Sequence, residues 1–478
     1  MNKQTALQIL DERQDFLFAI SDSIWDNPET DYTEVVSSAI LKDALEKEDF
    51  TVTSNLGDIP TAFSGSYGSG SPVIGILGEF DALPGLSQKA DIARKEPLSE
   101  GGNGHGCGHN LLGTGSLAAA IAVKEYLKET KKPGTVIFFG CPAEEGGSAK
   151  AFMAKAGVFK GVDIALSWHP NCLNSVWSFS TLANVRIHYS FKGVSAHAGT
   201  SPHLGRSALD ALELMNMGVQ FLREHIIPEA RIHYAITNTG GDAPNVVQAE
   251  AESVYLIRAP KNDQVKEIYE RVNQIAMGAA MMCGVKVNIE LEKACSNILV
   301  NHTLEKVLYE NMQSAGVPVY TDEEYAFAKE IQDTMPDRVL LADRFERTMG
   351  EKGRQIGEEY DKKSINSFIL PYQPSEKALP GSSDVGDVSW VCPTSQIVAV
   401  TCAGGTPEHT WQMVAQGKSS IAHKGLLYAG KVLAGAAIDL IDNPELVKEA
   451  AEEFKRKVGP RGYQSLLPDE AKPVMKQK

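Results

Sequence analysis

Apolar segments of strand length alternate with helical segments between residues 72 and 169. The apolar runs are residues 73–77, 135–141 and 163–168, and residues 114–130 and 148–156 have helical periodicity. This alternation predicts an α/β fold with a mainly parallel sheet, in which functional groups gather where the strands end. The polar residues that follow these strands are Asp81, Glu144, Glu145 and His169.

A different order of elements is expected from residue 184 onward. Strands are expected at 184–192, 231–238, 248–258 and 285–291, with helices at 207–225 and 263–281. The order β-α-β-β-α-β is typical of a ferredoxin-like α+β unit. We therefore predict an inserted domain, residues 184–299, within a discontinuous catalytic domain of residues 1–183 and 300–478. Residues 320–380 are left unassigned, and the tail from Lys455 is expected to be loosely ordered.

Charge and cysteine content narrow the class of protein. The chain of 478 residues has 46 Lys and Arg against 61 Asp and Glu, a formal net charge of −15. This acidic balance argues against nucleic acid and anionic membranes as partners. Seven cysteines without disulfide-framework spacing indicate a reduced, cytoplasmic compartment.

Five scattered residues have side chains that commonly bind metal ions, and they are expected to meet in one cavity. One thiolate, three imidazoles and one carboxylate suit Zn, Mn or Co better than Ca or Mg. The residues are Cys107, His109, Glu145, His169 and His409. The neighbouring Glu144 is available as a general base, so the set predicts a metal-dependent hydrolytic site.

Two other interpretations of these residues remain open. Adjacent glutamates also occur as acidic residues at a helix N-terminus. Cys107 and His109 could instead be a cysteine nucleophile with a histidine base, although that chemistry does not need Glu145, His169 and His409.

Further polar residues are expected to support this site. Asp81 ends a strand and is predicted to orient a ligand imidazole. Asp384 and Asp387 could do the same, bind substrate, or lie in a solvated turn. In the inserted domain, a predicted anion or oxyanion clamp consists of His197, Asn245 and Arg258.

Several motifs together resemble the M20 metallopeptidase and amidohydrolase family, in the branch with Gly-Cys-Gly-His. They are Gly-Glu-Phe-Asp-Ala-Leu, His-Gly-Cys-Gly-His-Asn, Cys-Pro-Ala-Glu-Glu-Gly-Gly, Trp-His-Pro, Ala-His-Ala-Gly and Gly-Thr-Pro-Glu-His-Thr-Trp. The chain departs from the family pattern at Asn110, where many relatives carry Asp.

The resemblance implies two divalent ions per subunit, Mn²⁺ or Zn²⁺, with the five residues above as ligands and Glu144 as base. It also implies a homodimer, or a heterodimer with a related subunit, formed by the inserted domain. His197 would then polarise the scissile carbonyl in the partner's site, while Asn245 and Arg258 hold a substrate carboxylate.

The expected reaction is hydrolysis of the amide between an acyl or aroyl group and an amino acid. The favoured substrate is p-aminobenzoyl-glutamate. The alternatives are a dipeptidase or general N-acyl-amino-acid hydrolase on the same residues, and a non-catalytic binding subunit of a hetero-oligomer.

Overall fold

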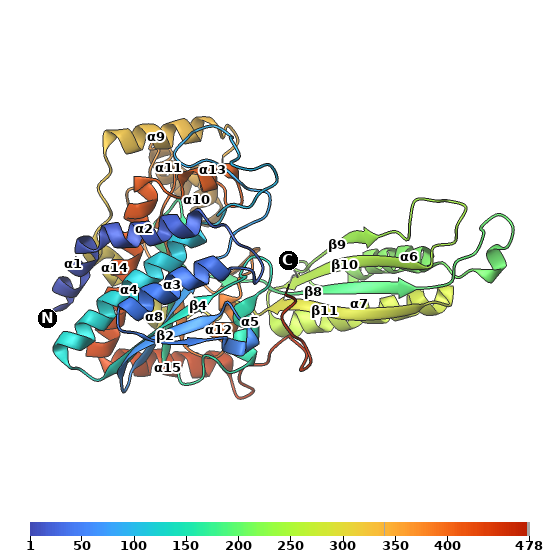
Figure 1. Cartoon of the computed structure of the whole chain (residues 1–478), viewed down its shortest axis with the longest axis horizontal. Coiled ribbons are helices and arrows are strands. Elements are labelled where there is room, and N and C mark those ends of the chain that lie inside the picture. Colours follow the sequence, from blue (N-terminus) through green and yellow to red (C-terminus); the bar gives the residue numbers. More distant parts are fainter. Residues whose placement is uncertain (339, 476–478) are drawn as a thin grey trace.

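A seven-stranded sheet lies at the centre of the larger part of the molecule (Figure 1). The computed structural model describes residues 1–338 and 340–475. The order across this sheet is β1-β2-β4-β3-β5-β13-β6. The bounds are β1 Thr51–Ser54, β2 Phe63–Ser69, β3 Val73–Glu79, β4 Gly134–Cys141, β5 Ile164–Asn171, β6 Ser175–Val176 and β13 Thr394–Val400.

The four central strands, β4, β3, β5 and β13, pair in parallel, and the outer strands pair antiparallel. Successive side chains of a strand point to opposite faces, so both faces of these apolar strands need a cover. Ile76 and Phe138 pack into the core beneath α4, and Leu77 and Phe139 pack into the core that contains α5. The predicted α/β fold with a mainly parallel central sheet is confirmed.

Helix α4 (His109–Thr130) covers the sheet and packs against α14 (Ser420–Asp442). The two helices approach closely at Gly430, where an added Cβ would meet Ala118 Cβ and the Gly115 carbonyl oxygen at 3.1 Å each. α4 was expected to begin at Thr114, but it begins at His109 because Gly108 makes the preceding left-handed turn. This earlier start places His109 at the N-terminus of a buried helix.

A separate four-stranded antiparallel sheet projects from the larger part, on the right of Figure 1. Its strands are β8 Ala183–Lys192, β9 Arg231–Asn238, β10 Glu250–Ala259 and β11 Lys286–Cys295. Helices α6 (Ala208–Leu222) and α7 (Asn262–Cys283) pack together and against it. The strand order β11-β8-β10-β9 is that of the ferredoxin-like arrangement. We call residues 183–295 the projecting unit.

The remaining elements complete the larger part. The helices are α1 Lys3–Glu12, α2 Gln14–Trp25, α3 Val35–Lys47, α5 Ala149–Lys155, α8 His302–Ala315, α9 Asp322–Asp333, α10 Leu341–Met349, α11 Glu351–Tyr360, α12 Val385–Ser389, α13 Trp411–Gln416 and α15 Pro444–Val458. A short second pair of strands is formed by β7 Ser180–Thr181 and β12 Ala378–Leu379. Within the part of the chain that the structure describes, no helix has the length and apolar character needed to cross a membrane.

Two segments are more regular than the sequence indicated. The unassigned segment 320–380 contains helices α9, α10 and α11. The expectation of a loose tail is wrong for its first part, because α15 continues to Val458 and the Tyr463 hydroxyl donates to Asp387 Oδ1 at 2.7 Å. Leu467 is also buried, in the core that contains α5.

Candidate metal centre

The turn that carries Cys107 and His109 is fixed by Gly108. Gly108 has a φ of +75°, and an added Cβ there would lie 3.0 Å from Pro170 Cβ. A residue with a side chain would therefore be both strained and crowded at this position. The Gly-Cys-Gly-His motif thus places a thiol and an imidazole on either side of a tight turn, next to the end of β5.

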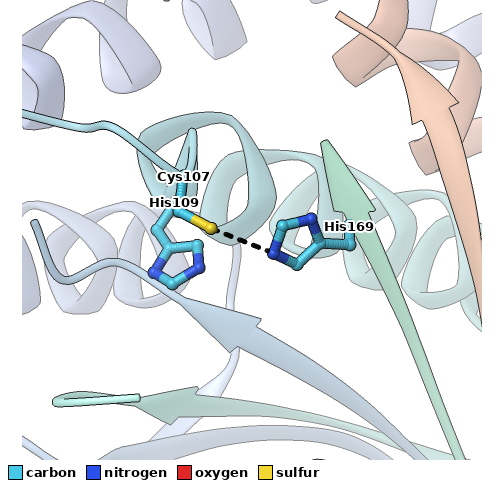
Figure 2. Close-up of side chains that lie close together, drawn as sticks. All are labelled: Cys107, His109 and His169. Atoms are coloured by element: carbon cyan, nitrogen blue, oxygen red, sulfur yellow. Dashed lines mark hydrogen bonds between the residues drawn. The ribbon is translucent and has the colours of Figure 1, made fainter. Parts of the chain in front are cut away.

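Three side chains converge at this turn (Figure 2). Cys107 Sγ lies 3.4 Å from His169 Nε2. One ligand atom of each of Cys107, His109 and His169 lies within 4.8 Å of the others. His109 begins α4, Cys107 lies two residues before it, and His169 comes from β5, so the structure brings together residues that are at least 60 positions apart in the sequence.

A second group of three shares the same sulfur atom. Cys107, Glu145 and His409 also place one ligand atom each within 4.8 Å of one another. His409 Nε2 lies 3.3 Å from Glu145 Oε2. The backbone N–H of His409 donates to the Gly106 carbonyl at 2.8 Å, which ties the His409 loop to the Cys107 turn. The five residues expected from the sequence therefore lie around one point, with Cys107 common to both groups.

The imidazoles are oriented by hydrogen bonds through their other nitrogen atoms. Asp81 Oδ1 lies 2.8 Å from His109 Nδ1, and Asp81 Oδ2 accepts the backbone N–H of Glu145 at 2.9 Å. His169 Nδ1 lies 2.7 Å from the Pro170 carbonyl oxygen. These contacts favour the tautomers in which each Nε2 carries a free lone pair, which is the arrangement that metal-binding histidines require.

The donor set fits a divalent cation. His109 Nε2 and Glu145 Oε1 are buried and make no hydrogen bond with any described residue. Burial raises the pKa of the Cys107 thiol, and the nearby charges of Glu145, Glu408 and Glu144 raise it further. A site with this excess of negative charge and two unsatisfied buried acceptors would be stabilised by cations.

Glu144 and Glu145, the adjacent glutamates that follow β4, have pKa values shifted in opposite directions. Burial raises the pKa of Glu144 well above its usual value, and the charges of Glu79, Asp384 and Glu145 add to this. Burial also acts to raise the pKa of Glu145, but the contacts with His409 and His109 lower it to about 2. The two carboxyl groups are therefore suited to different roles.

Two residues of the expected clamp lie far from this centre within one chain. The His197 ring nitrogen Nδ1 accepts the backbone N–H groups of Gly199 and Thr200, and the Ala198 N–H donates to the Asn245 carbonyl at 2.8 Å. His197 and Asn245 are exposed and lie beyond the outer end of β8 and β10.

Arg258 lies at the opposite end of β10, next to the larger part. It pairs with Asn184 in the sheet, and its guanidinium donates to Ser382 Oγ at 2.9 Å. With a rise of about 3.4 Å per residue, Arg258 is roughly 25 Å from the end of β10 near Asn245. One chain alone therefore does not bring the three residues of the expected clamp together.

Two buried charged residues near the centre, Glu79 and Lys150, were not assigned a role from the sequence, and both contact or adjoin Asp384. Glu79 Oε2 lies 3.3 Å from His109 Nε2, and Lys150 Nζ lies 2.8 Å from Glu79 Oε1 and 2.5 Å from Asp384 Oδ1. Asp384 and Asp387 are both buried, so the solvated-turn interpretation of these two aspartates is wrong. The position of Glu79 at a strand end, two residues before Asp81, was the one available signal.

The side chain of Asn110, the residue after His109, faces neighbouring helices. Its side-chain amide donates to Ser21 Oγ and to the Gly417 carbonyl, each at 3.1 Å. Asn110 is fully buried, and these contacts join α4 to α2 and to the residue after α13.

A cavity of about 490 Å³ opens beside the centre. It lies between the loop 85–101 and residues 409–412, and its lining includes Lys95, His409 and Trp411. A substrate could therefore reach His409 from this side.

Comparisons with known proteins show which proteins this chain resembles. The chain is 49% identical over 95% of its length, and 95% of the relative's, to the B chain of p-aminobenzoyl-glutamate hydrolase from Escherichia coli. It is 28% identical to the Xaa-Arg dipeptidase of Mus musculus, over 95% of this chain and 93% of that protein.

Two solved structures share the fold. An aminohydrolase from methicillin-resistant Staphylococcus aureus has a TM-score of 0.64 at 17% identity, covering 92% of this chain and all of that one (100%). A dinuclear metal-binding M20 peptidase from Bacillus subtilis has a TM-score of 0.56 at 16% identity, covering 90% of this chain and 99% of that one. The family model described as peptidase family M20/M25/M40 matches residues 75–353. From this match and the 49% identical relative, we conclude that the chain belongs to the M20 peptidase family.

Proposed function

We propose that this M20 hydrolase cleaves the amide bond between an aroyl or acyl group and an amino acid, with p-aminobenzoyl-glutamate as the favoured substrate. The observation that carries this proposal is the shared position of Cys107 in two groups of three ligands, with Glu144 beside them. The relative that is 49% identical over almost the whole chain supports the choice of substrate.

Two divalent ions, Mn²⁺ or Zn²⁺, are proposed as the cofactor. Cys107, His109 and His169 would hold one, and Cys107, Glu145 and His409 the other. When bound, such a pair polarises a carbonyl and makes water acidic enough to lose a proton near neutral pH. Thiolate and imidazole ligands favour these ions over Ca²⁺ and Mg²⁺.

Glu144 is proposed as the general base. Its carboxylate takes a proton from the attacking water and later gives it to the leaving nitrogen, so that one group serves as base and then as acid. A carboxylate oxygen of Glu144 lies within 4.8 Å of the ligand atoms of Glu79 and His109, which puts it next to the first ligand group. Asp81 holds His109 and the Glu145 backbone in place during the reaction.

We propose that the substrate site is completed by a second subunit. His197 and Asn245 would reach the partner's centre, where His197 stabilises the developing oxyanion and Asn245, with Arg258, holds the substrate carboxylate. This assignment is supported by the exposed position of His197 and Asn245 at the outer end of the projecting unit and by the inner position of Arg258.

The projecting unit is proposed as the dimerisation surface. It corresponds to the inserted domain that was expected from the sequence at residues 184–299. On one side α6 exposes Met217 and Phe221, and the edge strand β9 exposes Tyr234 and Ile236. An unpaired strand edge beside exposed apolar side chains is typical of a subunit contact. The partner is a second copy or a related chain, since the 49% identical relative is named as one of the subunits of its enzyme.

Mixed dimers test the two-subunit site. Neither His197→Ala nor Glu144→Gln homodimers should turn over substrate at more than a few per cent of wild type. A dimer with one subunit of each kind keeps one complete site, so partial activity should return when the two proteins are mixed and re-associated. No recovery in verified mixed dimers would show that the site is built within one chain.

Substrate comparison tests the reaction. The kcat/KM for p-aminobenzoyl-glutamate should exceed that for N-acyl amino acids and for dipeptides, and each is measured on the Zn²⁺- and Mn²⁺-loaded protein. Preference for dipeptides with a C-terminal arginine would favour the dipeptidase alternative, which the 28% identical relative suggests. Purified protein that binds no transition metal after reloading would favour a non-catalytic role in a hetero-oligomer.

A further inference from the structure

Lys150 is a fully buried lysine of α5 that has no part in the reaction proposed above. Its ammonium nitrogen lies 2.8 Å from Glu79 Oε1 and 2.5 Å from Asp384 Oδ1, and its side chain is 0% exposed. Its backbone N–H also donates to Asp384 Oδ2 at 2.8 Å. Burying the charge of a lysine costs free energy of folding unless carboxylates compensate it, so the burial of Lys150 needs a physical explanation.

The contacts of Lys150 lead directly to the candidate metal centre. Glu79 bridges the two, because its second oxygen, Oε2, lies 3.3 Å from His109 Nε2. Glu79, His109 and Glu144 each place one ligand atom within 4.8 Å of the others. Glu79 is thus the residue through which Lys150 can act on His109 and on the space in front of Glu144.

The balance of charges around Lys150 also indicates that Lys150 acts on Glu79. Glu79 and Asp384 are buried carboxyl groups, and the half-buried Glu144 lies close to Glu79. Across residues 1–338 and 340–475, Lys150 is the only lysine or arginine in an ion pair with Glu79 or Asp384. Without its ammonium group, Glu79 would lose the contact that fixes one of its oxygens and would be free to turn.

We propose that Lys150 is a positioning residue of the metal centre, acting through Glu79; this inference rests on the proposed function. Lys150 holds Glu79 Oε1 toward α5, so Oε2 faces His109 and Glu144. Asp384, which precedes α12, holds Lys150 from the other side. Residues that support metal ligands from outside typically change metal affinity by about 10- to 100-fold when they are replaced.

The chain offers a matched control in Lys124. Lys124 is also buried, at 2% exposed, and its ammonium lies 3.0 Å from Glu48 Oε2 and 2.5 Å from Glu125 Oε1. It belongs to α4 but contacts no residue of the candidate centre. Lys124→Met and Lys150→Met therefore remove the same kind of buried ion pair, at two distances from the metals.

The experiment compares Zn²⁺ binding in these two variants. Each purified protein is stripped of metal, and its affinity for Zn²⁺ is measured by competition with a chromophoric chelator, alongside thermal unfolding of the metal-free protein. Both variants should unfold at lower temperature, but only Lys150→Met should bind Zn²⁺ about 10- to 100-fold more weakly than wild type. Equal Zn²⁺ affinity in Lys150→Met and wild type would overturn the proposal.

Glu79→Gln keeps the proposal testable if Lys150→Met does not fold. This substitution removes the charge through which Lys150 acts, so Zn²⁺ binding should weaken by a similar factor. When both substitutions are combined, the loss should be no larger than with Glu79→Gln alone. Wild-type affinity in Glu79→Gln, or additive losses in the double variant, would contradict positioning through Glu79.

The same titration separates this proposal from the proposed function. If wild type binds two Zn²⁺ ions per chain and the Lys150 and Glu79 variants bind them equally well, the proposed function stands and positioning by Lys150 is wrong. If wild type binds no Zn²⁺, both proposals are wrong.

Discussion

The two sheets of this protein differ in how their side chains are covered. All seven residues of β13 in the central sheet are buried, whereas β9 at the edge of the small sheet has seven of eight residues exposed. The candidate metal ligands gather at the central sheet, where both faces are packed. His197 and Asn245 lie on the projecting unit, where apolar side chains face outward.

This difference suggests two kinds of role. In the central region, Cys107 and His109 are buried among packed elements, and the half-buried His169 and Glu145 and the exposed His409 meet them within one chain. In the projecting unit, exposed apolar residues such as Phe221 at 71% and Ile236 at 44% leave a surface that a partner could cover. Three pairs of substitutions and one measurement of pH dependence test this contrast.

The largest difference in kcat is expected between two variants that each lose one carboxylate, one in the central region and one in the projecting unit. Glu144→Gln keeps the shape of the side chain but removes the base, so kcat should fall by about 10²- to 10⁴-fold. Metal content, measured by elemental analysis, should stay at the wild-type value. Glu250→Gln, an exposed carboxylate on β10, is the control and should leave kcat unchanged. Near-normal turnover by Glu144→Gln would end its assignment as base.

Replacing one phenylalanine in each region compares what its packing contributes to stability and to dimerisation. Phe138→Ala empties a fully buried position in β4 and should lower the free energy of unfolding by about 3–5 kcal/mol. Phe221→Ala should change the stability of an isolated subunit by less than about 0.5 kcal/mol but weaken dimerisation. Chemical denaturation and sedimentation velocity measure the two effects. If Phe221→Ala dimerises as wild type does, α6 is not at the subunit contact.

Substitution of two buried aspartates, one at a time, distinguishes effects on the orientation of the metal ligands from effects on the stability of the fold. Asp81→Ala removes both acceptors that hold His109 and the Glu145 backbone, so Zn²⁺ affinity should fall by about 10- to 100-fold. Asp387→Ala removes contacts to Ser296 and Tyr463 instead. It should lower the unfolding temperature without changing Zn²⁺ affinity. Equal effects on affinity would show that both substitutions act through stability.

The smallest effect is expected where α15 meets α8, the first helix after the projecting unit. Burial acts to raise the pKa of Glu453, but the backbone N–H groups of His302 and Thr303 lower it to about 2. A carboxyl group with a lowered pKa in the folded state stabilises the protein above its unfolded pKa of about 4.3. The stability difference between wild type and Glu453→Gln should therefore be constant above about pH 5 and shrink toward pH 2. A difference that grows on acidification would contradict this.

Much of the fold followed from local sequence patterns. The apolar runs of β3, β4 and β5 and the alternating pattern of β8 have distinct periodicities, so the two sheets could be told apart. Residues at strand ends could be predicted to converge because parallel strands end at one edge of a sheet. This reasoning found Asp81, Glu144, Glu145 and His169, and the motifs added the others.

Other features depended on contacts that no local pattern reveals. The ion pairs of Lys150 join three distant segments, and a lysine in a helix usually indicates an exposed position. The sequence predicted that His197, Asn245 and Arg258 would lie on one small sheet, but only Arg258 lies in a strand, and the length of β10 separates it from the other two. Helices α10 and α11 pack against each other, but both segments are rich in charged residues, a composition that loops share with exposed helices.

The sulfur atom of Cys107 belongs to both groups of candidate ligands, so a chemical change at this one atom would affect both groups. Peroxide converts an accessible cysteine thiolate to sulfenic and then sulfinic acid, and the second product is not readily reversed. Such a lesion at this one atom would disrupt both cation positions in a single event. Burial and the neighbouring carboxylates raise the pKa of the free Cys107 thiol, so its oxidation by peroxide should be slow in the chelated protein, where no cation favours the thiolate.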